Sequence, residues 1–189
     1  MTTHNTTRRN LVFSLAAMPA ALGASPQAVR AADNAHTEQE IIHTAAAIHQ
    51  EVIFQASRKR IYRALTDSAA FDRVVRLSEA VASGMVPRTA GPNQISRSVG
   101  GAFSLFGGYI TGLQLELVRE QRIVQAWRAG SWRAGEYSIA RFVLTDDGPG
   151  TRLVLDHQGF PAEAAQHLAE GWHGNYWQPL AQALAQAGQ

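Results

Sequence analysis

Short apolar runs alternate with turn residues from Gln94 to Gly159, and this pattern constrains the fold more than any other feature of the sequence. The runs ITGLQLELV, RIVQAWRA, YSIARFVLT and TRLVLDHQG carry the branched and aromatic residues that strands favour. Turn residues separate the runs at Gly100-Gly101, Gly107-Gly108, residues 119–122, the SWRAGE stretch and the DDGPG stretch of residues 146–150. The sequence therefore predicts a meandering antiparallel sheet.

A strand and two short helices are predicted ahead of this sheet. Apolar and polar residues alternate from Ile48 to Ala56, which is the period of a strand. Ser57 is then in position to cap a first short helix. A second helix, capped by Asp67 or Ser68, is predicted to run to about Ala82.

A long helix is predicted to close the chain. Apolar residues recur every three or four positions from Ala165 to Leu184, which gives the helix one apolar stripe. Pro179 removes one backbone donor, so we expect a bend near Asn175. A sheet with one apolar face and a helix with one apolar stripe bury both by packing together. The predicted class is α+β.

The composition is that of one folded domain, and it excludes several kinds of chemistry. The chain has 189 residues, is 46% apolar and contains no cysteine. Thiol catalysis, cysteine metal sites and disulfides are therefore excluded. The sequence contains no G-x-S-x-G, H-E-x-x-H, P-loop or G-x-G-x-x-G motif. We accordingly expect no cofactor and no metal, and we favour a protein that is not an enzyme.

Residues 1–31 have the three parts of an export signal. Arg8 and Arg9 precede a mildly apolar run from Leu11 to Ala24, and small residues around Arg30 offer a cleavage site after Ala31. The paired arginines resemble a bacterial twin-arginine signal, which carries folded cargo. The sequence thus predicts a periplasmic or secreted protein with a cleavable signal at residues 1–31, a linker at 32–47 and one domain at 48–187.

The basic charge of the chain comes from this signal. Three arginines lie in residues 1–31, and without them 14 basic groups face 15 acidic ones. A domain with that balance has no general attraction for phosphate backbones, so we expect no nucleic-acid partner.

Several separated motifs in the predicted domain resemble a known family. They are GGAFSLFGGYITG, ELVREQRIVQAWR, the W-x-x-G-x-Y-S stretch of residues 132–138, GTRLVLDHQGFP and GWHGNYWQPL. They resemble the heat-shock-protein-90 ATPase activator homologues, a branch of the START-like (SRPBCC) helix-grip superfamily. The resemblance covers about residues 48–187 and implies a curved antiparallel sheet around a long C-terminal helix, often with an apolar cavity between them. Because the eukaryotic activators act in the cytosol, the export signal argues against co-chaperone activity here.

Aromatic side chains are the main candidates for a binding site. A cleft between a concave sheet and one helix is where apolar pockets with a few polar groups form. The residues expected to line it are Phe54, Phe103, Tyr109, Trp127, Trp132, Tyr137, Phe142, Trp172 and Tyr176. Trp127 faces the cleft only if Gln125 also points inward or a bulge intervenes. The alternative is that each ring is an ordinary core residue.

A second candidate site lies where the last strand meets the long helix. Asp156, His157, Glu163 and His167 fall close to that junction and include the residue types of an acid/base pair or a metal site. Their spacing matches no metal-ligand pattern, and histidines at such positions are commonly surface or rim residues. We therefore assign no catalytic residue.

Three functional classes follow from these observations. The first is a non-catalytic exported domain that holds a small apolar molecule in a cavity above about 300 Å³; a solid core would contradict it. The second is a protein-interaction or chaperone-like module, which requires a contiguous exposed apolar patch, with Trp177 as a candidate. The third is a cyclase- or dehydratase-like enzyme, which requires an acid/base group such as His157 inside the cavity.

Overall fold

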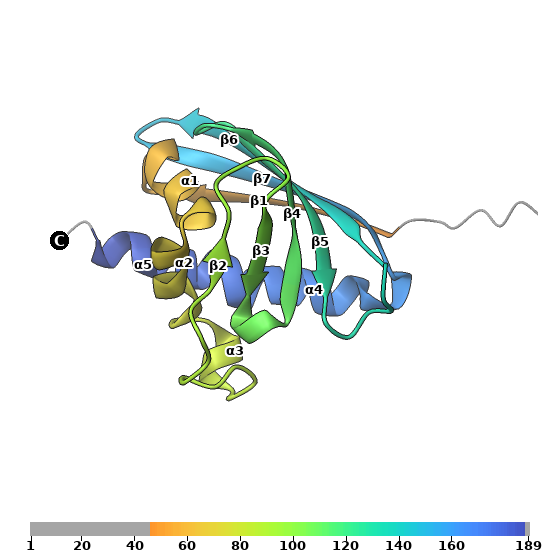
Figure 1. Ribbon diagram of the computed structural model, residues 1–189. Coiled ribbons are helices and arrows are strands. Elements are labelled where there is room, and N and C mark those ends of the chain that lie inside the picture. The colour runs from red at the N-terminus through yellow and green to blue at the C-terminus, as the bar shows by residue number, and fades with distance from the viewer. Residues whose placement is uncertain (1–45, 188–189) are drawn as a thin grey trace, which may run out of the picture. The chain divides into compact units, whose positions relative to one another are not determined.

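The computed structural model describes residues 46–187, which form a curved antiparallel sheet and a long C-terminal helix (Figure 1). The predicted α+β helix-grip class is confirmed. The export signal predicted at residues 1–31 lies outside the described residues. So does the predicted linker, apart from residues 46 and 47, which already belong to the first strand.

The sheet has seven strands in the order β1-β7-β6-β5-β4-β3-β2. The strands are β1 (Ala46–Phe54), β2 (Gln94–Ile95), β3 (Ala102–Leu105), β4 (Ile110–Val118), β5 (Arg122–Ala129), β6 (Ser138–Asp147) and β7 (Gly150–Phe160). Each neighbouring pair is antiparallel, and strands β2 to β7 follow one another in sequence order. This is the predicted meander, with β1 added beside β7.

The predicted turns separate the strands. The β6–β7 hairpin turns through Gly148 and Pro149, since Asp147 pairs with Gly150 across it. Gly148 has φ of 56°, a left-handed conformation that a two-residue hairpin requires at its first central position. A single turn of 3₁₀ helix, η1 (Phe106–Gly108), joins β3 to β4.

Three short helices follow β1: α1 (Arg58–Thr66), α2 (Ser68–Val75) and α3 (Glu79–Ala82). The helix that we predicted to continue to Ala82 is therefore two helices. Asp67 caps α2 by accepting a bond from the Ala70 N–H at 2.9 Å. Ser78 starts α3, its hydroxyl accepting from the Val81 N–H at 3.4 Å. A second capping residue inside the predicted helix explains why the chain breaks there.

The C-terminal helix runs through η2 (Ala162–Ala164), α4 (Ala165–Trp172), the π-helical turn η3 (His173–Trp177) and α5 (Gln178–Gln186). We expected a bend near Asn175, and this prediction is wrong. A π turn occupies that position instead, and the helix continues across the sheet (Figure 1). A π turn widens the helix enough for residues five apart to share a face. Trp172 and Trp177 accordingly stack, with ring centroids 5.6 Å apart and planes 15° apart.

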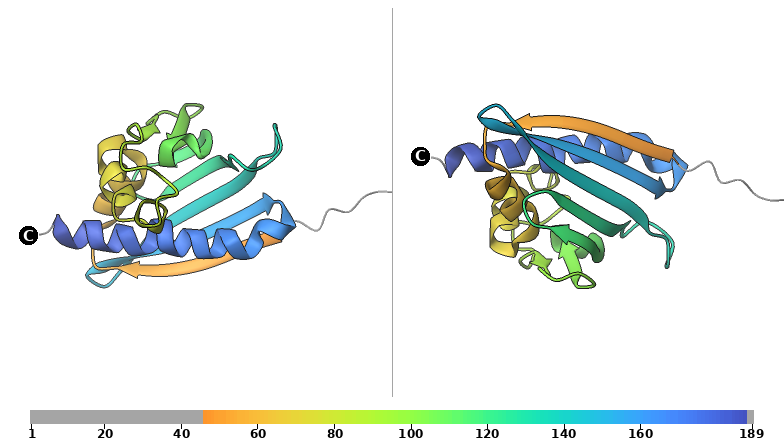
Figure 2. Two further views of the ribbon diagram at one scale, coloured as in Figure 1. Left: turned by 90° about the horizontal axis from the view of Figure 1, so that it is seen from below. Right: turned by 90° about the horizontal axis from the view of Figure 1, so that it is seen from above.

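The C-terminal helix covers the concave face of the sheet, and α1 to α3 lie on the same side at one end (Figure 2). The core lies between these layers and is rich in aromatic side chains. The outer face carries ion pairs instead, such as Arg152 with Glu51 at 2.8 Å and Arg141 with Asp156 at 3.3 Å. One face of the sheet is buried and apolar and the other is exposed to solvent, which explains why apolar and polar residues alternate along the strands.

Gln50 of β1 fastens the C-terminal helix to the edge of the sheet. Its side-chain oxygen accepts from the Trp177 indole N–H at 2.6 Å, and its side-chain nitrogen donates to the Ala169 carbonyl at 3.0 Å. Both partners lie on the helix, one on each side of the residues 172–176 segment. One side chain of β1 therefore fixes the position of the helix along the sheet.

We predict that Gln50→Ala lowers the free energy of unfolding by about 1–3 kcal/mol, because it leaves the buried Trp177 indole N–H without an acceptor and removes one of the bonds to the Ala169 carbonyl. Gln55→Ala, at an exposed position just beyond the same strand, is the matched control and should change it by less than about 0.5 kcal/mol. Urea unfolding followed by circular dichroism measures both. Equal stability of the two variants would contradict the fastening role of Gln50.

Candidate functional site

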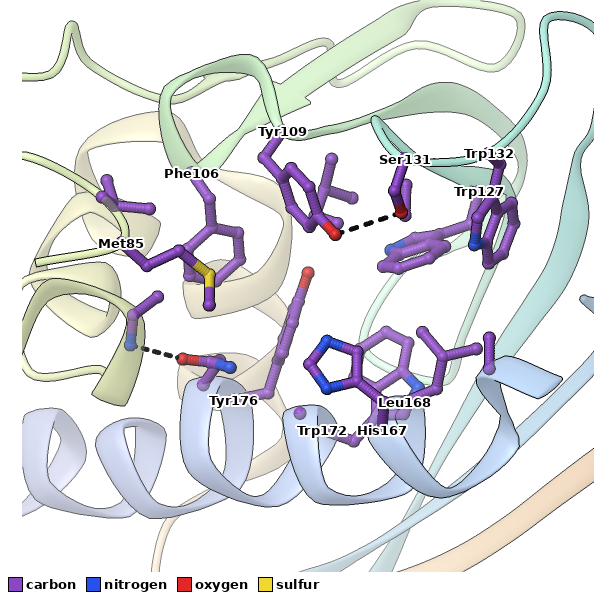
Figure 3. Close-up of a pocket in the computed structure, with 17 residues that line it drawn as sticks. Met85, Phe106, Tyr109, Trp127, Ser131, Trp132, His167, Leu168, Trp172 and Tyr176 are labelled. Carbon is purple, nitrogen blue, oxygen red and sulfur yellow. Dashed lines mark hydrogen bonds between the residues drawn. The ribbon is translucent and has the colours of Figure 1, made fainter. Parts of the chain in front are cut away.

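A pocket of about 120 Å³ lies between the inner face of the sheet and the C-terminal helix (Figure 3). Strands β4 and β5 supply one wall, the C-terminal helix supplies the opposite wall, and the segment around α3 closes one end. The lining is predominantly apolar and consists of Ala80, Met85, Val86, Phe106, Tyr109, Ile110, Trp127, Ala129, Ser131, Trp132, Ala164, His167, Leu168, Gly171, Trp172, Asn175 and Tyr176.

Five of the nine predicted site residues line this pocket: Tyr109, Trp127, Trp132, Trp172 and Tyr176. Trp127 and Gln125 lie two residues apart on β5, and both face inward. An inward-facing Gln125 was one of the two conditions that the sequence set for Trp127 to line the cleft. Gln125 is buried and donates to the Gln114 side-chain oxygen at 3.2 Å, so its side-chain amide has a partner within the core.

The other four predicted residues do not line this pocket. Phe54 is buried at the end of β1, outside the lining. Phe103 packs on Gly112 of β4, where any side chain would collide with its ring. Phe142 lies behind Trp172, edge to face at 5.6 Å. Tyr137 precedes β6 and is 50% exposed.

Other lining residues were not among the predicted site residues. Met85 and Val86 come from the loop after α3, where no periodicity marks a residue as facing inward. Phe106 sits at a turn with φ of 54°, a conformation unusual for a non-glycine residue. Its N–H donates to the Asn93 side-chain oxygen at 2.8 Å, and its ring contacts Tyr176 at 5.5 Å. The glycine pair after Phe106 was the one signal of a tight turn there.

The pocket is smaller than predicted. We expected more than about 300 Å³, and its volume is about 120 Å³. Aromatic side chains of the C-terminal helix occupy the difference, with the rings of Trp172 and Tyr176 4.3 Å apart and both buried. An apolar cavity of about 150 Å³ accommodates benzene, so the free space here corresponds to about one aromatic ring.

Two polar atoms in the pocket wall lack a partner within residues 46–187: the indole nitrogen Nε1 of Trp127 and the hydroxyl of Tyr176. Both side chains are more than nine-tenths buried. Burial raises the pKa of the Tyr176 hydroxyl, which the nearby Trp127 indole N–H partly offsets, so the hydroxyl keeps its proton. A buried polar group without a partner costs about 1–3 kcal/mol. Each of the two groups can donate, and the described chain offers neither an acceptor of normal geometry.

His157 is fully buried behind the pocket and belongs to a chain of hydrogen bonds. Its Nδ1 accepts from the Trp172 indole N–H at 3.0 Å, so the proton of the neutral ring must be on Nε2. Nε2 then donates to the Ser138 hydroxyl at 2.7 Å, and that hydroxyl donates to the Trp127 carbonyl at 3.0 Å. Burial lowers the pKa of His157 to about 4. His157 is thus a neutral positioning residue.

The acid/base cluster considered from the sequence does not form. Asp156 and His157 are adjacent in β7 and point to opposite faces of the sheet. Asp156 lies on the outer face, 2.7 Å from His49, while Glu163 is exposed and His167 lies at the pocket rim. Within the described part of the chain, no group of three or more acidic, histidine or cysteine side chains is placed to hold a metal ion.

The sequence matches the family model described as "Activator of Hsp90 ATPase homolog 1-like protein" over residues 55–185. The chain belongs to this family. The resemblance noted in the sequence motifs is confirmed.

Curated relatives in the Hsp90 ATPase activator homologue family are much longer than the chain. The human protein named "Activator of 90 kDa heat shock protein ATPase homolog 1" is 29% identical over 96 residues, which are 51% of this chain and 28% of the relative. A Dictyostelium discoideum homologue is 36% identical over 77 residues, 40% of this chain and 20% of the relative. The aligned regions thus span less than a third of either relative.

Solved structures share the fold of the activator homologue family at low sequence identity. An Hsp90 activator from Plasmodium falciparum aligns with a TM-score of 0.61 at 23% identity, over 75% of this chain and 96% of that one. CalU16 from Micromonospora echinospora aligns with a TM-score of 0.55 at 19% identity, over 76% and 78% of the two chains. Identity at this level supports the common fold and nothing more specific.

Two surface features bear on the alternatives for this family member. Trp177, a candidate for an exposed contact residue, is buried, so it belongs to no surface patch. Leu113, Ala126 and Ile139 instead form a row across β4, β5 and β6 on the outer face, with Leu113 42% and Ile139 36% exposed. No helix in residues 46–187 has both the length and the apolar character that crossing a membrane requires.

We predict that His157 makes this domain less stable as the pH falls from about 6.5 to 4. The unfolded chain takes up a proton near pH 6.5, whereas folded His157 resists protonation down to about pH 4. Stability is therefore full above pH 6.5 and falls by about 3 kcal/mol on acidification to pH 4.

Urea unfolding at several pH values between 4 and 7.5 measures this dependence. His157→Gln should lose the part of the slope that His157 supplies, whereas His173→Gln, at an exposed position, should keep it. Superimposable pH profiles for the wild type and His157→Gln would show that His157 is not the buried neutral group described here.

Proposed function

We propose that this domain binds a small, predominantly apolar molecule, about one aromatic ring in size, between the sheet and the C-terminal helix. The observation that carries the proposal is the pocket itself: about 120 Å³ of space that the aromatic core leaves unfilled. Close packing is the rule in protein interiors, so an apolar space of this size is a natural position for a guest.

The pocket has an opening through which such a molecule can enter. Met85 is 63% exposed and Tyr109 is 39% exposed, and both contribute to the lining. The Tyr109 hydroxyl lies 3.3 Å from the Ser131 hydroxyl across the rim (Figure 3). Side chains with this exposure change rotamer readily, so entry requires no movement of the sheet or the C-terminal helix.

The lining favours binding over catalysis. Of the pocket residues of the described chain, only Tyr109, His167 and Tyr176 are titratable, and the Tyr176 hydroxyl keeps its proton. His157, the group that an enzyme would need inside the cavity, is held behind Trp172 in fixed hydrogen bonds. A carrier or sensor of a small apolar molecule is therefore the function that the site supports best.

We predict that toluene binds the domain at this pocket and that Ala164→Leu weakens its binding by about tenfold or more, because the added side chain fills the rim. Ala183→Leu is the matched control, since Ala183 is also half-buried on the C-terminal helix but does not line the pocket. It should change the Kd less than about twofold. Tryptophan fluorescence and isothermal titration calorimetry measure the binding.

The absence of binding by any single-ring probe would overturn the proposal. The protein-interaction class would then be the standing alternative, for which the outer face offers the row of Leu113, Ala126 and Ile139. The names of the relatives concern activation of a heat-shock ATPase. Activation of such an ATPase by this chain belongs to the same protein-interaction alternative.

We further propose that the protein acts outside the cytoplasm, after export through residues 1–31. The support is the arginine pair Arg8-Arg9 ahead of an apolar run, with small residues at the expected cleavage point. A twin-arginine route carries folded cargo, and a chain without cysteine needs no oxidising compartment to complete its fold.

We predict that the double variant Arg8→Lys, Arg9→Lys keeps the protein in the cytoplasm at its full length. Arg30→Lys, which leaves the pair intact, should be exported like the wild type. Cell fractionation with immunoblotting and intact mass spectrometry of each fraction distinguishes the two. Wild-type protein found only in the cytoplasm, with residues 1–31 still attached, would overturn the export proposal.

A further inference from the structure

We propose that the ligand of this pocket is a neutral compound that presents one hydrogen-bond acceptor, such as a carbonyl oxygen, to Trp127 and Tyr176 together. This inference rests on the proposed function and adds the chemical class of the guest. The structure assigns specificity to two groups, the indole N–H of Trp127 and the hydroxyl of Tyr176.

These two groups are the unused hydrogen-bonding capacity of the buried pocket wall. Several other polar groups in the wall have partners. The Trp172 indole N–H donates to His157, the Asn175 side-chain oxygen accepts from the Ala80 N–H at 2.8 Å, and the Tyr109 hydroxyl pairs with Ser131. A guest therefore meets two free buried groups rather than a generally polar surface.

The kind of free group decides what the guest must offer. An indole N–H can only donate, and a tyrosine hydroxyl can donate. The Tyr176 hydroxyl points into the pocket from the helix, toward the wall that carries Tyr109 and Trp127 (Figure 3). Trp127 of β5 and Tyr176 of η3 line the same small pocket from facing walls, so one guest between the walls lies beside both.

The charge of the lining separates a neutral acceptor from an anionic one. No lysine, arginine, aspartate or glutamate of the described chain lines the pocket, and the lining histidine, His167, is exposed at the rim. Burying a carboxylate without a cationic partner is unfavourable, whereas a carbonyl oxygen needs only hydrogen-bond donors. A neutral ketone, aldehyde, ester or amide on a single ring meets these conditions, and a carboxylate or a plain hydrocarbon does not meet them equally well.

The test compares acetophenone with α-methylstyrene, which has nearly the same size and outline but a CH₂ group in place of the carbonyl oxygen. Benzoate serves as the anionic analogue. In the wild type, acetophenone should bind about tenfold more tightly than α-methylstyrene, once each Kd is corrected for the compound's partition between water and octanol. Benzoate should bind more weakly than acetophenone.

Tyr176→Phe should remove about fivefold or more of the preference for acetophenone while leaving the Kd of α-methylstyrene unchanged within about twofold. Tyr137→Phe is the matched control, because Tyr137 is 50% exposed and lies outside the pocket lining. It should keep the preference. Because Tyr176→Phe removes an unpaired hydroxyl, it should also be at least as stable as the wild type.

The indole N–H of Trp127 gives a second, independent readout. In proton–nitrogen correlation spectra, acetophenone should move the Trp127 indole proton downfield, as a new hydrogen bond does, and α-methylstyrene should not. Equal affinities of the two probes in the wild type, or a preference that survives Tyr176→Phe unchanged, would overturn this inference while the pocket proposal stands. If neither probe binds, both proposals fail.

Discussion

The hydrogen bond between Trp172 and His157 is the contact on which the helix–sheet packing depends. Trp172 is 2% exposed and touches the rings of Trp127, Phe142, Tyr176 and Trp177, so its indole N–H lies where water has no access. A buried N–H needs an acceptor, and neutral His157 supplies one. The chain then passes through Ser138 to the Trp127 carbonyl, joining the C-terminal helix to β7, β6 and β5. The orientation of Trp172, and with it one wall of the pocket, follows from this chain.

The π turn determines what the helix presents next to Trp172. In an α-helix, residues five apart point about 140° away from each other. The wider turn lets Trp177 stack on Trp172 and reach Gln50, while Tyr176 faces the pocket. Gly174 fits here because the Glu79 carboxylate lies where a Cβ would be, and Asn175 caps α3 through the Ala80 N–H. The irregular turn therefore positions three side chains and joins α3 to the long helix.

The sequence was sufficient for the fold, because strand alternation, turn glycines and the long helical stripe are local patterns. It predicted the pocket wall less well. Trp172 and Tyr176 were found because they belong to the apolar stripe of the helix. Tyr137 and Phe142 were misplaced because composition marks a ring as apolar without saying whether it is exposed, in the wall or behind it. Met85, in a loop without periodicity, gave no signal at all. The π turn could not be foreseen either, since Pro179 predicts an irregularity but not its type.

The small volume of the pocket and its two free donors have a common consequence for selectivity. Apolar burial contributes in proportion to area, so a space for one ring distinguishes poorly among molecules of similar shape. Polar groups left without partners discriminate more strongly, because a guest without an acceptor leaves them unpaired and does not remove the free-energy penalty of their burial. Trp127 and Tyr176 are well suited to this, since Trp132 packs edge to face against Trp127, with ring centroids 5.5 Å apart, and Phe106 packs against Tyr176. Rings held in this way cannot turn to pair elsewhere, so the acceptor must come from the guest.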